Sequence, residues 1–221
     1  MTRSERQANC RFTYSVETID NVYDQLVEIL EANVPHLKLD MVKEHVSTQM
    51  LPLILQWHYP HLNRLIFVSN HIKFRADIVQ LYEYFERFES QQMMGLTLAQ
   101  DAKFATSFAV HRHLQPDSKL GLSPPQGWPG FNTELMLLDL DKMRQSNLLK
   151  RYLDLENQLP IMTKYDFSSR QVLPQLDEWL TLVGIEKPQL FFELPCQWNV
   201  QQIMDSDAFE YCRIDIKAMA N

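Results

Sequence analysis

Short apolar runs alternate with longer amphipathic stretches along the chain. Apolar residues recur at helical spacing in residues 15–33, 40–57 and 78–88, and Pro52 predicts a kink in the second of these stretches. The run at residues 64–68 is too short and too apolar for a helix and predicts a buried strand. Further short strands are predicted at residues 93–96, 134–140 and 189–194. Helical spacing returns over residues 141–155 and 175–183. This alternation predicts an α/β fold with a mainly parallel sheet.

The chain is expected to form a single domain over residues 1–221, with residues 1–11 disordered. One long connection interrupts the alternation, because residues 115–131 hold four of the eleven prolines and three of the five glycines. A loop of this length inside a compact domain is often functional.

Composition excludes several classes of protein. Hydrophobic residues make up 45% of the chain and charged residues 22%, as in globular proteins. The formal net charge of -7 argues against a nucleic-acid surface, and no apolar run is long enough to span a bilayer. The first residues lack the apolar segment of a secretory signal. Of the three cysteines, Cys196 and Cys212 can pair in an oxidising compartment; three free thiols in the cytosol are the alternative.

Isolated polar pairs give weak signals of a site. His111 and His113 are spaced for one face of a strand, and they are interpreted as surface residues rather than as a regulatory pair. Asp139 and Asp141 form a D-x-D at a strand end; a helix cap by Asp141 is favoured over a cation site. The aromatic run at 82–88 has helical periodicity and predicts core packing rather than a stacking platform.

Four blocks together carry a family resemblance. They read "YSVETID", "HIKFRADIVQLYEYFERF", "PPQGWPGFNTELMLLDLDKMRQS" and "GIEKPQLFFELPCQWNVQQ". With their spacing, they resemble glycosyltransferase family eight and, within it, the xyloside xylosyltransferases, over residues 12–217. The resemblance implies a GT-A type, Rossmann-like fold that uses UDP-xylose and manganese. It also implies xylose transfer to O-linked xylosyl-glucose on EGF-like repeats, in the endoplasmic reticulum or Golgi.

The resemblance also shows where this chain departs from the family. The two metal-binding aspartates before "KFRAD" correspond to Ser69 and His71, and the family's C-terminal histidine ligand is best matched by Ala220. Glu134 stands where the family has a glycine, so its side chain is expected to project toward the sugar or diphosphate. No metal ligand is therefore expected to be retained.

Five residues match what remains of the family's site. Asp177 and Glu178 align with its G-D-Q-D motif and are the predicted catalytic residues. Asn132, Trp198 and Asn199 are the predicted substrate-binding residues, with packing and hydrogen bonding within the fold as the alternative. The signal anchor and the first uridine-binding strand and helix would precede Tyr14, so the N-terminal part of the fold is expected to be missing.

These observations predict a xylosyltransferase-like protein with little or no catalysis. One alternative is residual xylosyltransferase activity, with His71 or Asp139 recruited to a rearranged cation site. Another is a non-catalytic binding or scaffolding pseudoenzyme. An incomplete gene product is a third reading, but flanking exons would not restore aspartates at Ser69 and His71.

Overall fold

The computed structural model describes residues 28, 32, 51–74, 76–146, 148, 155–168 and 174–199. The helix predicted over 15–33, the disorder predicted for 1–11, and Ala220 lie outside these residues, apart from two positions of that helix.

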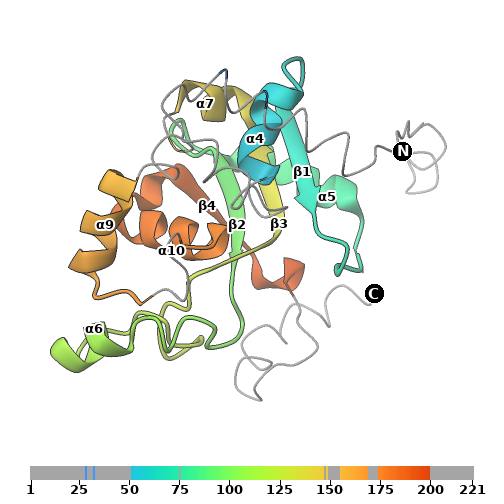
Figure 1. Ribbon diagram of the computed structural model, residues 1–221. Helices are drawn as coiled ribbons and strands as arrows, with labels where there is room; N and C mark the ends of the chain where they lie inside the picture. Colours follow the sequence, from blue (N-terminus) through green and yellow to red (C-terminus); the bar gives the residue numbers. More distant parts are fainter. Residues whose placement is uncertain are drawn as a thin grey trace.

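Four strands form one sheet in the order β1-β3-β2-β4 (Figure 1). They are β1 (Arg64–Val68), β2 (Met94–Leu98), β3 (Phe131–Asp139) and β4 (Phe191–Leu194). Strand β3 pairs antiparallel with β1 and β2, whereas β2 and β4 are parallel, so β1, β2 and β4 share one direction. The α/β class is confirmed, but the prediction of mainly parallel pairing is wrong because β3 is inserted in reverse.

The reversal of β3 follows from where the preceding connection ends. Ala99 N–H, just past β2, donates to the carbonyl of Gly130 at 2.9 Å. Gly130 has a φ of 92°, a left-handed conformation that glycine adopts without strain. The loop therefore ends beside the C-terminal end of β2. Strand β3 starts at that end and runs antiparallel to β2, whereas a parallel strand would need a crossover that returns the chain to the end where β2 begins.

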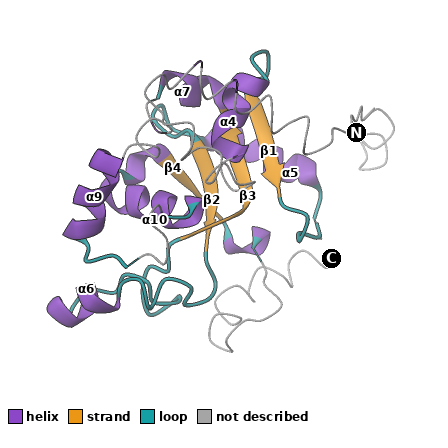
Figure 2. Ribbon diagram, viewed as in Figure 1, coloured by secondary structure: helices purple, strands orange, loops and turns teal. Residues whose placement is uncertain are grey.

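Helices cover both faces of the sheet (Figure 2). One face packs against α4 (Leu51–His58), α7 (Leu140–Gln145) and α10 (Leu176–Glu186), with α9 (Leu155–Lys164) beyond them. The other face packs against α5 (Ile78–Tyr82) and two 3-10 helices, η2 (Glu83–Arg87) and η4 (Cys196–Trp198). Side chains of β3 alternate between the two cores, as the strand pleat requires: Met136 and Leu138 face the first, and Leu135 and Leu137 the second.

Several local predictions need correction. Strand β1 is half-buried rather than buried, because it lies at the edge of the described sheet. The helix predicted over 78–88 divides into α5 and η2, and its N-cap is Asp77, whose carboxylate accepts from Val79 N–H at 2.9 Å. Core packing of the aromatic run holds for Phe85, whereas Tyr82 is 46% exposed.

The histidine pair lies in a helix, α6 (Ala109–Leu114), and not in a strand. His111 is buried against Phe108 and Tyr165, while His113 is exposed. Two residues apart on a helix point in different directions, so the two imidazoles do not share a face. The interpretation as surface residues therefore holds for His113 only.

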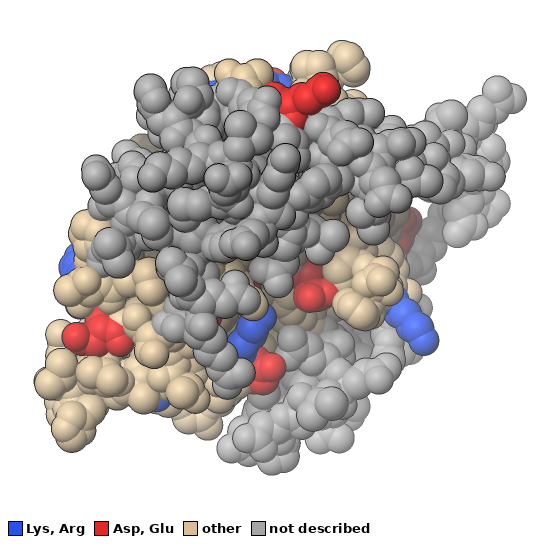
Figure 3. Space-filling view, in the orientation of Figure 1, with Lys and Arg blue, Asp and Glu red and all other residues tan. Residues whose placement is uncertain are grey.

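Within the described residues, no helix has the length and apolar content needed to cross a bilayer. On the face shown in Figure 3, acidic and basic side chains of the described residues are interspersed, and neither sign forms a broad patch there. The described residues visible on that face therefore form no basic patch of the kind that neutralises nucleic-acid phosphates.

Candidate functional site

The predicted site residues meet at one end of the sheet, the lower end in Figure 1. Ser69 and His71 follow the end of β1, Asn199 follows β4, and Asn132 lies near the start of the reversed β3. In α/β folds, ligands bind beyond the carboxyl ends of parallel strands. The topology therefore brings together residues that are far apart in the sequence.

An asparagine pair links β2, β3 and the segment that follows β4 at this end. Asn132 Nδ2 donates to Asn199 Oδ1 at 2.8 Å, and Asn199 Nδ2 donates to the carbonyl of Leu98 at 2.8 Å. Asn132 Oδ1 also accepts from Glu134 N–H at 2.9 Å. Each carboxamide nitrogen has two N–H groups, so each retains a second donor beyond these bonds. The pair therefore stabilises this end of the sheet, and each carboxamide still has one N–H group that can donate a hydrogen bond.

Trp198 lies in the core rather than on an open surface. Its side chain is only 8% exposed, and it packs edge-on against Tyr84 with ring centroids 6.4 Å apart. Among the described residues, its indole N–H has no hydrogen-bond partner. A substrate-binding role for Trp198 stays a prediction.

Asp177 and Glu178 occupy the first turn of α10. Asp177 is buried and forms an ion pair with Lys103 Nζ, and its Oδ1 accepts from Glu178 N–H at 2.8 Å. The Glu178 carboxylate accepts from Gln175 N–H at 2.8 Å, completing a capping box. Both carboxylates therefore stabilise the start of the helix. Sequence reasoning did not identify Lys103, which lies in the loop after β2 with no motif around it.

The strand exit after β1 is occupied by a serine–glutamate contact. Ser69 Oγ donates to Glu134 Oε2, and Ser69 N–H donates to the Glu134 carbonyl at 2.8 Å. His71 is exposed, and its backbone N–H donates to Ser69 Oγ at 3.3 Å. Among the described residues, no three His, Cys, Asp or Glu side chains are grouped to hold a metal ion.

The second aspartate pair lies elsewhere. Asp139 pairs in register with Arg64 at the opposite end of the sheet, so it cannot join His71 in a rearranged cation site. Asp139, not Asp141, caps α7 by accepting from Lys142 N–H at 3.1 Å. Asp141 instead forms an ion pair with Arg144 one turn later. The cap prediction was right in kind but wrong in residue.

Cys196, in the turn after β4, is disulfide-bonded. Cys10 and Cys212 lie outside the described residues. The alternative of three free thiols is therefore wrong.

Comparisons with known proteins agree with this geometry. No protein-family model matches the chain. It is 32% identical over 181 residues to xyloside xylosyltransferase 1 of Homo sapiens, covering 80% of this chain and 45% of that protein. It is 30% identical over 170 residues to xylosyl- and glucuronyltransferase LARGE1 of Homo sapiens, covering 76% and 20%. The chain thus spans less than half the length of these curated relatives.

A solved structure of a xyloside xylosyltransferase has a similar fold. The crystal structure of mouse xyloside xylosyltransferase 1, in its apo form, superposes with a TM-score of 0.69 at 26% identity. The match covers 90% of this chain and 68% of that chain.

Proposed function

We propose that this chain, a homologue of xyloside xylosyltransferase 1 and of the LARGE glycosyltransferases, is a xylosyltransferase-like domain that does not carry out metal-dependent transfer. In this role it binds the glycan acceptor as a non-catalytic module. The observation that carries the proposal is the contact between Ser69 and Glu134 at the strand exit where the family places two metal-binding aspartates.

The residues at this exit do not fit a manganese ion. A hard divalent cation prefers several oxygen ligands, and carboxylates supply them best. Here the candidates are a serine hydroxyl that already donates to Glu134, one imidazole on His71 and one carboxylate. The Glu134 carboxylate also adds negative charge where a diphosphate would lie, which disfavours the nucleotide.

The polar groups that remain suit a neutral sugar. Asn132 and Asn199 are half-buried and each keeps one carboxamide N–H for a ligand. Asp177 and Glu178, proposed as catalytic by resemblance, are already engaged with Lys103 and Gln175. This supports binding of carbohydrate without chemistry. By resemblance, the ligand is the xylosyl-glucose carried by EGF-like repeats.

A second candidate function is residual xylosyl transfer from UDP-xylose. The observation in its favour is that Glu134 brings a carboxylate to the strand exit, near His71, which replaces the lost aspartates in part. This version requires Glu134 to leave Ser69 and bind a cation instead.

The disulfide at Cys196 supports a location in an oxidising compartment, whether the domain only binds glycans or retains transfer activity. Disulfides persist in oxidising environments such as the lumen of the secretory pathway and are rare in the cytosol. The bond therefore supports placing this domain in the endoplasmic reticulum or Golgi, where its glycosylated partners would lie.

Titration of xylosyl-glucose into the chain, without manganese, tests the proposed binding. We expect saturable binding, weakened about three- to tenfold by Asn132→Ala through loss of one or two hydrogen bonds. Asn63→Ala is the matched control, because Asn63 is exposed at the opposite end of the sheet, beside Leu140. Absence of binding at millimolar sugar, or equal affinity of the Asn132 variant, would rule out this role for the asparagine pair.

A further inference from the structure

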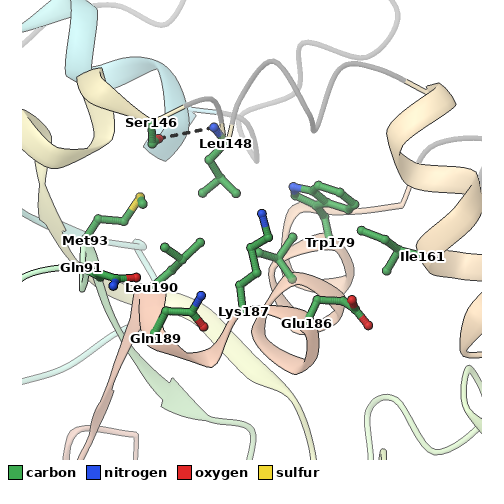
Figure 4. Close-up of a pocket in the computed structure, with 11 residues that line it drawn as sticks. Gln91, Met93, Ser146, Leu148, Ile161, Trp179, Glu186, Lys187, Gln189 and Leu190 are labelled. Carbon is green, nitrogen blue, oxygen red and sulfur yellow. Dashed lines mark hydrogen bonds between the residues drawn. The ribbon is translucent and has the colours of Figure 1, made fainter.

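A cavity lies at the end of the sheet where β2 and β4 begin, opposite the candidate site. Figure 4 shows the residues that line it. Its volume is about 340 Å³, within the range of small-molecule sites. Met93 and Leu190 line it just before β2 and β4 begin, Leu148 lines it after α7, and Trp179 comes from α10. None of these residues belongs to the site where Asn132 and Asn199 meet.

Among the described residues that line the cavity, Lys187 alone has a cationic side chain. Lys187 is the residue at the C-terminal end of α10, and its N–H donates to the carbonyl of Val183 at 2.7 Å. Figure 4 shows its ammonium group directed into the cavity, toward Leu148 and Trp179. Among the described residues, no carboxylate lies within ion-pair distance of Lys187.

The neighbouring carboxylate forms its hydrogen bonds with other donors and none with Lys187 among the described residues. Glu186 points away from the cavity in Figure 4, and its Oε1 accepts from Lys164 Nζ at 2.5 Å and from Tyr165 Oη at 2.6 Å. The hydrogen bond from Lys164, and then that from Tyr165, lower the pKa of Glu186 below its usual value. Glu186 is therefore an ionised carboxylate satisfied by other donors, and the Lys187 ammonium remains available to a ligand.

The other walls combine an apolar surface with a few polar groups. Trp179 is 1% exposed, and the edge of its ring that carries the indole nitrogen faces the cavity in Figure 4. Gln91 and Gln189 add carboxamide groups on the side nearest β2 and β4. Mostly apolar walls with a few oriented polar groups are typical of sites for small organic ligands.

We infer that this cavity binds a small organic carboxylate, with the carboxylate on Lys187 and an apolar body against Trp179, Leu148 and Met93. A charge-assisted hydrogen bond is stronger than one between neutral groups, which favours an anion over a neutral analogue. The inference goes beyond the proposed function and is independent of it, because the two sites share no residue.

Nuclear magnetic resonance of the indole N–H groups tests the inference, with the Trp179 signal assigned from Trp179→Phe. The probe is 4-phenylbutyrate, and 4-phenylbutan-1-ol is its neutral match. We expect the carboxylate to shift the Trp179 signal in a saturable way, with at least about tenfold tighter binding than the alcohol.

Variants of the cation make the test specific. Lys187→Gln is expected to reduce carboxylate affinity about tenfold, to that of the alcohol, whereas Lys187→Arg keeps it within about threefold. Lys119→Gln removes the same charge from an exposed position in the loop after α6 and should change nothing. Equal affinity for the two probes, no shift of the Trp179 signal, or an unaltered affinity in Lys187→Gln would each overturn the inference.

Discussion

A variant carrying Ser69→Asp, His71→Asp and Glu134→Gly is expected to bind UDP in a manganese-dependent way, at least about tenfold more tightly than the unaltered chain. The two aspartates would supply oxygen ligands at the strand exit, where Ser69 and Glu134 now bond to each other. Removing Glu134 also removes a negative charge from the strand exit, where the resemblance would place the diphosphate. Calorimetric titration of UDP, with and without manganese, measures the gain.

A matched control separates the effect of the added carboxylates from the effect of the room opened by removing the Glu134 side chain. Ser69→Asn, His71→Asn and Glu134→Gly open the same region but add no carboxylate, so we expect no manganese-dependent gain. If this control gained as much affinity as the aspartate variant, the loss of metal ligands would not be the reason for weak nucleotide binding.

Lys103→Met is expected to lower the free energy of unfolding by about 2–4 kcal/mol. The Asp177 side chain is 7% exposed and Lys103 is its ion-pair partner, so the substitution leaves a buried carboxylate without its counterion. The Lys103 side chain is 49% exposed, and solvent near the ammonium keeps the loss toward the lower end of the range. Urea denaturation followed by tryptophan fluorescence measures the change.

Two further variants check the origin of this loss. Lys103→Met with Asp177→Asn is expected to regain half or more of the lost stability, because the neutral amide still accepts from Glu178 N–H and has no charge to desolvate. Lys119→Met, at an exposed position, should cost less than about 0.5 kcal/mol. A double variant no more stable than Lys103→Met alone would show that the ion pair is not the cause.

The strands were the most predictable part of the fold. The apolar run at 64–68 coincides with β1, because Asn63 and Ser69 bound it closely. Strand direction was not predictable, since apolar runs look the same in either orientation and the register of β3 depends on where the loop before it ends. The prediction that His111 and His113 share one face of a strand was wrong for a related reason. Two positions are too few to distinguish the periodicity of a strand from that of a helix.

The site was predictable only in part. Resemblance singled out Asn132 and Asn199, and the fold joins them across 67 positions of sequence. The partners that define their surroundings, Lys103 for Asp177 and Ser69 for Glu134, depend on loops far apart in the chain. In the D-x-D at 139–141 the sequence does not decide which aspartate precedes the helix. Because α7 starts at Leu140, Asp139 is its cap and Asp141 lies in its first turn.

Calorimetric titration of UDP-xylose into the unaltered chain, with and without manganese, tests whether the chain lacks metal-dependent binding of the nucleotide sugar. The contact between Ser69 and Glu134 predicts no manganese-dependent binding at micromolar concentrations of the nucleotide sugar. Micromolar binding that requires manganese, and that is lost on chelation of the metal, would contradict the account and favour a transferase with a rearranged cation site at Glu134 and His71.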